Sequence, residues 1–278
     1  MSVITITIDG QMLSAREGQT VLEVAQEHGI RIPTLCQFTG LSNIGACRLC
    51  LVQINESPKL QPACVAKADN EMRVVTNTDQ LKNYRKSIVE LLLSERNHEC
   101  AVCVMSGDCE LQSVAAELGV TNVRYEYLFP KWEVDASHEK YVLDHNRCIL
   151  CARCVRTCAE LEGAHKWDLG RRGIQARVVT DLNARWGDSP TCTSCGKCVN
   201  ACPTGALSVK GATVHEMKKD RAQLRYLLEA RKTGLYDMGI LKHGSDKPAD
   251  KAGAGVLADT AEATSPAGAA GAKKEAVR

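Results

Sequence analysis

Cysteine is the residue of this 278-residue chain whose abundance and spacing point to chemistry, and it occurs fifteen times. Many of these cysteines are separated by only two or three residues. An odd number cannot pair fully as disulfides, and dense cysteine groups in a reducing compartment are more typical of metal sites than of disulfide scaffolds. We therefore interpret the chain as a metal protein with thiolate ligands.

Two segments share the spacing C-x2-C-x2-C-x3-C, one starting at Cys148 and one at Cys192, and the second continues into Pro203. Bacterial ferredoxins with two 4Fe-4S clusters have this pattern, and the fourth cysteine of each segment binds the other cluster. Structural zinc is the alternative, but zinc sites normally use two C-x2-C pairs far apart. We expect two 4Fe-4S clusters with these ligand sets: Cys148, Cys151, Cys154 and Cys202; Cys158, Cys192, Cys195 and Cys198.

An N-terminal group has the wider spacing C-x10-C-x2-C-x13-C. Gly45 and Ala46 lie in its loop and are small enough to wrap closely around sulfide, and backbone amides there can donate hydrogen bonds to cluster sulfur. Four thiolates with one remote member favour a 2Fe-2S cluster over zinc, in a longer loop than plant-type ferredoxins use. The expected ligands are Cys36, Cys47, Cys50 and Cys64.

The middle group holds only Cys100, Cys103 and Cys109. Four clusters with four ligands each need sixteen ligands, so one must come from a residue other than cysteine. Imidazole is the usual replacement for thiolate on iron, as in Rieske centres. His98 is therefore our expected fourth ligand of a third 4Fe-4S cluster, with Asp108 and Glu99 as rivals. We expect His145, beside a set that is already complete, on the surface.

The elements around the first group indicate a small α+β unit. Residues 3–9 alternate in polarity and end at Asp9-Gly10, a strong hairpin signal. A second strand follows at 11–15. A helix is expected over 21–28, with Thr20 as its cap, Gly29 as its stop, and one apolar face. Later strands at 49–54 and 72–76 complete a ubiquitin-like roll. The apolar face of the helix comprises Val21, Leu22, Val24 and Ala25.

Two helices flank the middle group, over 79–96 and 109–119, and the stretch 120–140 is expected to be irregular. We expect the apolar residues of the first helix to form a core face: Leu81, Tyr84, Ile88, Leu91 and Leu92. A terminal helix over 216–232 would dock by Leu224, Leu227 and Leu228. Five arginines crowd the ferredoxin-type segment and either offset cluster charge, dock a partner or form a solvated basic face: Arg147, Arg153, Arg156, Arg171 and Arg172.

These expectations define an α+β chain of five parts. They are a 2Fe-2S ferredoxin-like domain (1–78), a helical His/Cys3 4Fe-4S domain (79–140), a ferredoxin-like domain with two 4Fe-4S clusters (141–212), a C-terminal helix (213–240) and a low-complexity tail (241–278). The tail has too few large apolar residues to order itself. The formal charge of +2 gives no reason to expect a nucleic-acid partner. With no export signal and no apolar run of membrane length, we expect a cytoplasmic protein without membrane insertion.

The motifs "GACRLC" and "NHECAVCVMSGDCELQ", followed by the paired ferredoxin segments, carry a family resemblance over residues 1 to about 235. Their order resembles the N-terminal part of iron-only hydrogenases and the cluster-bearing subunit of respiratory complex I. It is most similar to the small diaphorase subunit of soluble NAD-reducing nickel–iron hydrogenase. The first two families place the ligand histidine four residues before the first cysteine, where this chain has Arg96. The "RNH-x-C" form around His98 is the one associated with the diaphorase subunit.

This resemblance implies an electron-relay subunit of an oxidoreductase, without a substrate-converting site of its own. It implies a larger diaphorase partner that carries FMN and NAD, and nickel–iron hydrogenase subunits that split hydrogen. The same relay could serve an NAD-dependent formate dehydrogenase or a complex I-type NADH dehydrogenase. A zinc-stabilised scaffold with no redox role is the alternative from another class.

Overall fold

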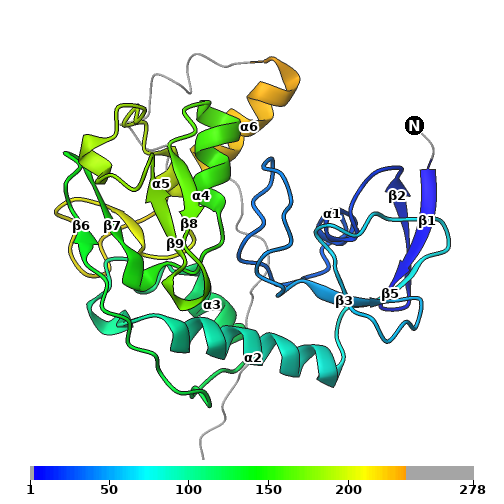
Figure 1. Cartoon of the computed structure of the whole chain (residues 1–278). Coiled ribbons are helices and arrows are strands. Elements are labelled where there is room, and N and C mark those ends of the chain that lie inside the picture. Colours follow the sequence, from blue (N-terminus) through cyan, green and yellow to red (C-terminus); the bar gives the residue numbers. More distant parts are fainter. Residues whose placement is uncertain (1–2, 236–278) are drawn as a thin grey trace, which may run out of the picture. The chain divides into compact units, whose positions relative to one another are not determined.

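The computed structural model describes residues 3–235, and its N-terminal part is a five-stranded mixed sheet beside one helix (Figure 1). Strand β1 (Val3–Ile8) pairs antiparallel with β2 (Gln11–Arg16) and parallel with β5 (Arg73–Val75). Strand β5 is also antiparallel to β3 (Leu51–Ile54), which pairs with the short β4 (Gln61–Pro62). The strand order is β2-β1-β5-β3-β4.

Helix α1 (Val21–Glu27) is fixed by a capping box, in which the Thr20 side chain accepts from the Glu23 amide and the Glu23 carboxylate accepts from the Thr20 amide. As predicted, its four apolar residues are buried. They pack against sheet residues such as Ile6 and Val52, which have no exposed surface. Each such side chain contributes about 1.5–3 kcal/mol by its burial.

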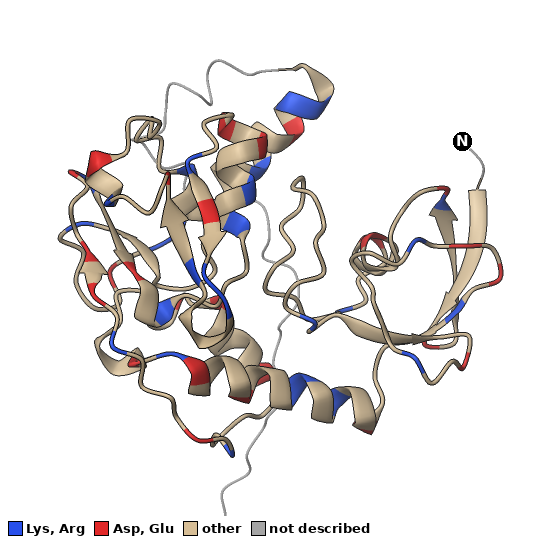
Figure 2. Cartoon of the chain, viewed as in Figure 1, with Lys and Arg blue, Asp and Glu red and all other residues tan. Residues whose placement is uncertain are grey.

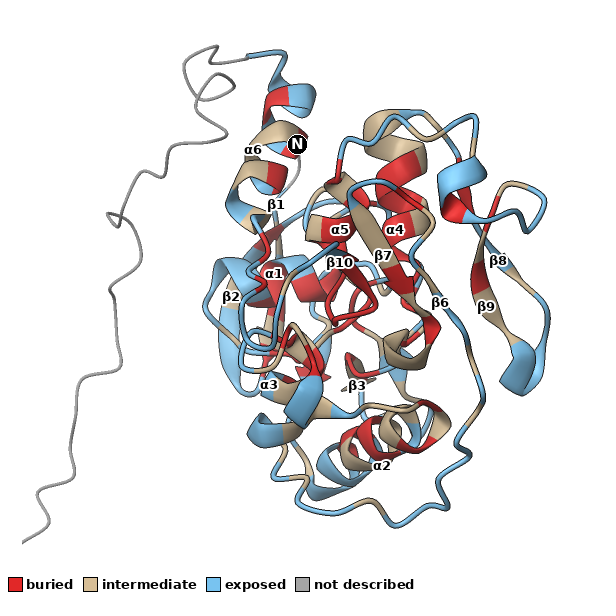
Figure 3. Cartoon of the chain, turned by 90° about the vertical axis from the view of Figure 1, so that its left-hand side faces the viewer, coloured by how far each residue is buried: buried red, intermediate tan, exposed pale blue. Residues whose placement is uncertain are grey.

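Helix α2 (Asp79–Glu95) begins where the sequence predicts, with Thr78 as its cap. The predicted core face is partly wrong, because Tyr84 and Leu91 are 45% and 49% exposed. Its buried side includes Arg85, which donates hydrogen bonds to the backbone carbonyls of Leu49 and Leu51 and so turns toward the first sheet. Figure 3 shows this division of α2 into a buried and an exposed side.

The short helix η1 (Cys100–Val102) and helix α3 (Glu110–Glu117) follow α2. The stretch that was predicted to be irregular contains only the two-residue strand β6 (Val134–Asp135) among its strands and helices.

The ferredoxin-type part contains two small antiparallel sheets. One has the order β10-β7-β6, and the other is a hairpin. Helix α4 runs directly into η3, and α5 lies within the last cysteine motif, ahead of β10. The elements of this part are β7 (Tyr141–Asp144), η2 (His145–Arg147), α4 (Arg153–Arg156), η3 (Thr157–Glu162), β8 (Trp167–Gly170), η4 (Gly173–Gln175), β9 (Arg177–Thr180), η5 (Trp186–Asp188), α5 (Lys197–Ala201) and β10 (Leu207–Val209).

Helix α6 (Arg221–Thr233) is the last described element. It begins five residues later than the predicted 216–232, because the Asp220 side chain caps it by accepting from the Gln223 amide, and it ends at Gly234 with positive φ. Leu224 and Leu228 are buried as expected, and several of the remaining residues are charged (Figure 2). No helix among residues 3–235 has both the length and the apolarity to cross a membrane. The predicted tail, 241–278, lies outside the described residues.

Candidate metal centres

The four N-terminal cysteines lie together at one end of the first sheet. The Cys50 and Cys64 sulfurs are 3.4 Å apart. Hydrogen bonds from the Cys47 and Cys64 thiols, together with backbone amides, lower the pKa of Cys36 to about 2. The structure therefore brings together all four residues that were predicted to bind one cluster.

Backbone amides around these thiols donate hydrogen bonds to the cysteine sulfurs. The Leu35 amide donates to the Cys47 sulfur at 3.4 Å, and the Cys47 amide donates to the Cys36 sulfur at 3.5 Å. Gly45 has φ +61°, and a Cβ there would lie 3.1 Å from Val65. Amide donors and a tight glycine turn are what a loop around cluster sulfide needs.

The ferredoxin-type cysteines are gathered into two separate cavities. Cys202 joins the first cysteine segment in one cavity, and Cys158 joins the second segment in the other. This exchange of the fourth cysteine is the arrangement predicted from the spacing. Burial raises the pKa of Cys148 to about 11 and that of Cys151 to about 12, so ligation would have to supply the driving force for deprotonation.

The two cysteine loops share an unusual backbone conformation. Leu150 and Ala152 have φ +51° and +54°, and the equivalent residues Ser194 and Gly196 have φ +56° and +70°. Left-handed conformations cost free energy for residues other than glycine. Alternation of right- and left-handed residues points successive N–H groups into one concavity, which is the backbone nest found at many Fe–S sites. Both loops therefore fit a 4Fe-4S cluster.

The third cavity contains His98 and the three cysteines of the middle group. His98 lines it together with Cys100, Cys103 and Cys109. The ring stays neutral at ordinary pH, because burial lowers the pKa of His98 to about 4. The Leu92 carbonyl accepts a hydrogen bond from the ring, and the buried Nε2 has no partner. A neutral imidazole held at one nitrogen and unsatisfied at the other is the usual state of a metal ligand.

Arg96 and His145, two other residues near these sites, are both buried. Arg96, at the position where the related families carry histidine, is 2% exposed and donates to the Ala176 carbonyl, and its guanidinium lies over the Trp132 ring. His145 was expected on the surface, and this is wrong, because it is only 9% exposed. His145, in η2, is buried because the Trp132 ring packs on it, with the two ring centroids 5.9 Å apart.

Several buried cations surround the cavities without a carboxylate partner. Arg156, Lys166 and Lys219 are at most 9% exposed, and none of them forms an ion pair within the described part of the chain. Burial lowers the pKa of Lys166 to about 8, and its Nζ has no hydrogen-bond partner. Unpaired buried charge is costly, so an anion is expected to balance it. Anionic clusters in the neighbouring cavities would supply that balance.

The five arginines of the ferredoxin-type part thus differ in their exposure. Arg153 and Arg156 are buried, whereas Arg171 and Arg172 are exposed, and Arg147 is intermediate and pairs with Asp144 at 3.2 Å. A solvated basic face describes only Arg171 and Arg172.

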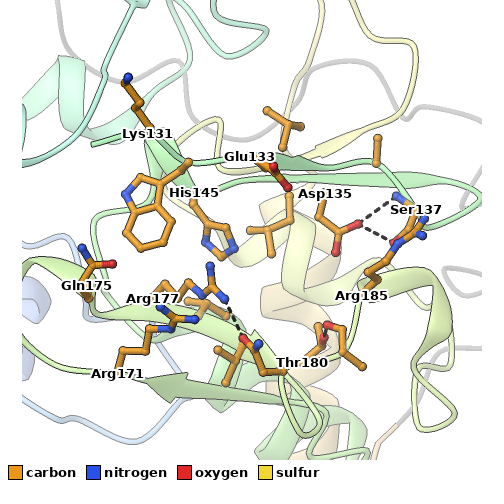
Figure 4. Close-up of a pocket in the computed structure, with 18 residues that line it drawn as sticks. Lys131, Glu133, Asp135, Ser137, His145, Arg171, Gln175, Arg177, Thr180 and Arg185 are labelled. Atoms are coloured by element: carbon orange, nitrogen blue, oxygen red, sulfur yellow. Dashed lines mark hydrogen bonds between the residues drawn. The ribbon is translucent and has the colours of Figure 1, made fainter. Parts of the chain in front are cut away.

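A further cavity of about 870 Å³ lies between β6 and the β8–β9 hairpin and contains none of the cysteines (Figure 4). Arg171 and Arg177 approach it from the hairpin side, and His145 lies opposite them. Nothing in the sequence pattern predicts this cavity, because it forms where three separate segments meet.

Among residues 3–235, no group of three or more His, Cys, Asp or Glu side chains is arranged to hold a single metal ion. A 4Fe-4S cluster differs from such a site, because each of its ligands binds a different iron.

Three protein families match successive parts of the chain. The 2Fe-2S iron-sulfur cluster binding domain matches residues 2–79. The NADH-ubiquinone oxidoreductase-G iron-sulfur binding region matches 85–124, and the ferredoxin-like domain of NADH-quinone oxidoreductase subunit 3 matches 140–208. The chain therefore has a 2Fe-2S domain followed by 4Fe-4S and ferredoxin-like domains.

The curated relatives include components of several oxidoreductases. The gamma subunit of NAD-reducing hydrogenase HoxS of Cupriavidus necator is 35% identical over 74% of this chain and 87% of its own length. The HndD subunit of the NADP-reducing hydrogenase of Solidesulfovibrio fructosivorans is 38% identical over 74% of this chain. A subunit of NADH-quinone oxidoreductase from Rhizobium meliloti is 37% identical over 74% of this chain. The chain spans only 36% and 24% of the length of these last two proteins.

A solved structure agrees with these relatives. One chain of the crystal structure of NAD+-reducing NiFe-hydrogenase in the H2-reduced state superposes with a TM-score of 0.73 at 34% identity. The match covers 78% of this chain and 98% of that chain.

Proposed function

Because this chain belongs to the family of the gamma subunit of NAD-reducing hydrogenase, we propose that it relays electrons through iron–sulfur clusters between a hydrogenase module and an NAD-linked diaphorase. The observation that supports this proposal most strongly is the gathering of fifteen cysteines and His98 into four sets of four. Two C-x2-C-x2-C-x3-C segments that exchange their fourth cysteine are typical of ferredoxins with two 4Fe-4S clusters.

The proposed ligand sets are those predicted from the sequence. Cys36, Cys47, Cys50 and Cys64 would hold a 2Fe-2S cluster, and His98 would complete a 4Fe-4S site with three cysteines. Two further 4Fe-4S clusters would occupy the ferredoxin-type cavities, within the predicted domain limits. The clusters, when bound, supply one-electron redox chemistry, and the protein positions and tunes them. The first sheet with α1 would then be the ubiquitin-like roll of a 2Fe-2S ferredoxin.

The chain's own residues set the conditions for electron transfer. Buried cations such as Lys166 would stabilise the reduced clusters, whose charge is more negative. Hydrogen bonds to sulfur act in the same direction, and the Trp186 Nε1 donates one to the Cys192 sulfur at 3.3 Å. The relay itself needs no acid, base or nucleophile from this chain.

The proposed partners follow from the relatives. A larger diaphorase subunit would carry FMN and NAD, and nickel–iron hydrogenase subunits would oxidise hydrogen, in a reversible reaction. A relay in a formate dehydrogenase or a complex I-type enzyme is the second candidate, which the similarity to the NADH-quinone oxidoreductase of Rhizobium meliloti favours. The position of His98 two residues before Cys100 favours the hydrogenase assignment.

Metal analysis of the native complex tests this proposal. The complex is purified anaerobically through an affinity tag on this chain, and its metals are measured. We expect nickel at about one atom for each copy of this chain, together with iron and flavin. Molybdenum or tungsten without nickel would instead identify a formate dehydrogenase. The absence of nickel, molybdenum and tungsten would favour a complex I-type assembly.

A further inference from the structure

Arg156, the last residue of α4, makes an unusual set of contacts. It is 6% exposed, and all the hydrogen bonds that its guanidinium donates within the described part of the chain go to backbone carbonyls. Nε donates to Ala152 at 3.3 Å, and Nη1 donates to Ser42. Nη2 donates to Cys151 at 3.2 Å and also to Cys36. The planar fork of arginine can satisfy several acceptors in this way, and lysine cannot.

The two carbonyls that share Nη2 belong to different candidate centres. Cys36 is a proposed ligand of the 2Fe-2S cluster, and Cys151 is a proposed ligand of the first ferredoxin-type cluster. Ala152 is one of the left-handed residues that shape the nest of this first ferredoxin-type site. One nitrogen atom therefore connects the backbones of two cluster loops that are more than a hundred residues apart in the sequence.

No carboxylate within residues 3–235 forms an ion pair with Arg156. Its neighbour Arg153 provides the contrast, because it is equally buried and forms an ion pair with Glu110 at 2.8 Å. The nearby Glu160 carboxylate accepts instead from the amide and hydroxyl of Ser42. A buried cation without a counter-charge is strongly unfavourable. Two anionic clusters, one on each side, would stabilise it.

Close packing holds the 2Fe-2S loop against the ferredoxin-type part around Arg156. Phe38 and Leu41 pack with Ala201, Leu224 and Leu228 in a separate apolar cluster. Gly40 lies so near Leu228 that an added Cβ would be 2.9 Å from the leucine Cβ. Arg156 itself is 6% exposed, and a charge that is largely shielded from water acts more strongly on its neighbours.

We propose that Arg156 couples the 2Fe-2S cluster to the cluster of Cys148, Cys151, Cys154 and Cys202. Its fork fixes the separation of the two cluster loops, on which electron transfer between the clusters depends. Its positive charge stabilises the added electron on either cluster. Arg156 is thus a positioning residue for the step between these two clusters, and this inference rests on the proposed cluster assignments.

The test compares three variants of the full chain in its anaerobic complex. Arg156→Gln removes the charge, Arg156→Lys keeps the charge without the fork, and Lys59→Gln removes a charge from an exposed position of the N-terminal part. Iron content is measured first. Redox titration followed by electron paramagnetic resonance then gives the reduction of each cluster and the magnetic interaction between the two reduced neighbours.

For Arg156→Gln we expect both neighbouring clusters to become harder to reduce. The ratio of reduced to oxidised cluster at a fixed potential should fall about tenfold, which is 59 mV for a one-electron couple. The other two clusters should not change. Arg156→Lys should keep both potentials within about twofold in this ratio, but weaken the magnetic interaction. Lys59→Gln should match the wild type.

The outcomes separate this inference from the proposed function. An iron-loaded Arg156→Gln chain with unchanged potentials would overturn the role of Arg156 and leave the relay intact. A wild-type chain without iron would overturn the relay itself. If Arg156→Gln loses iron, the Arg156→Lys variant provides the test instead. A weaker magnetic interaction and faster hydrogen exchange in residues 36–44 of that variant would support the coupling. Wild-type values for both measurements would refute it.

Discussion

The backbone carbonyl of Leu92 accepts a hydrogen bond from the imidazole of His98, and this contact determines which ring nitrogen is free. The Nε2 is buried without a hydrogen-bond partner, and the ring lines a cavity together with three cysteines. A carbonyl of helix α2 thus helps to orient the imidazole that we propose as the fourth ligand of this site.

Replacing His98 by alanine should therefore remove one 4Fe-4S cluster. Iron should fall by up to about four atoms for each chain, and one paramagnetic signal of the reduced protein should disappear. Iron analysis and electron paramagnetic resonance measure both quantities. His28→Ala, at an exposed histidine on the first domain, is the matched control. Wild-type iron and an unchanged spectrum in His98→Ala would contradict the assignment.

Replacing His98 by cysteine should restore a cluster with a different potential. A thiolate carries a negative charge that a neutral imidazole lacks, so reduction of this cluster should require a lower potential than in the wild type. Redox titration of the variant measures the shift. A shift to higher potential would show that the ring does not act as the fourth ligand.

Lys166 offers a test of the buried cations around the second ferredoxin-type site. Its Nζ lies 3.5 Å from the Trp167 ring centroid and 4.2 Å from that of Trp186, and it lines the cavity of Cys158 and Cys192. Lys166→Met should lower the ratio of reduced to oxidised cluster about tenfold at a fixed potential, since it removes one buried positive charge. Lys232→Met, on the exposed side of α6, should have no effect. Equal titration curves for the two variants would argue against electrostatic tuning by Lys166.

The equivalent residues Ala152 and Gly196 provide a paired test of the cysteine loops. In Gly196→Ala the new Cβ would be 2.5 Å from the Tyr141 hydroxyl, at φ +70°. We expect a loss of about 1–3 kcal/mol in the free energy of unfolding. Ala152→Gly, by contrast, should be nearly neutral, because relief of left-handed strain offsets the added freedom of the unfolded chain. The temperature at which the visible absorbance of the clusters disappears reports both effects, and a Gly196→Ala protein as stable as the wild type would refute the strained-loop account.

The stretch after residue 243, which lies outside the described residues, has a composition that predicts no contribution to assembly. A chain that ends at residue 243 should bind its partners as the full chain does. Co-purification of the complex through a tag on a partner measures this. Loss of assembly would instead identify the stretch as an interaction arm.

The cysteine spacing alone was enough to predict which residues the fold gathers. The exchange of Cys158 and Cys202 between the two ferredoxin-type sites is visible in the spacing, because a tight loop can present only three thiolates to one cluster. The capped helix over residues 21–28 was equally predictable, since its signals are local.

Residues whose environment depends on distant segments were not predictable. The role of Arg156 emerges only when the 2Fe-2S loop is seen to pack against α4. His145 was expected on the surface because nothing near it in the sequence shows that Trp132 covers it. Tyr84 and Leu91 recur at helical spacing but are exposed. The side of α2 that faces the first sheet carries Arg85, which donates hydrogen bonds to carbonyls of that part of the chain.

Metal analysis of the anaerobically purified chain tests the central claim most directly. If four sets of four ligands hold one 2Fe-2S and three 4Fe-4S clusters, the protein should be brown and contain about 14 irons for each chain, with almost no zinc. A colourless protein that carries zinc in place of iron would contradict the relay.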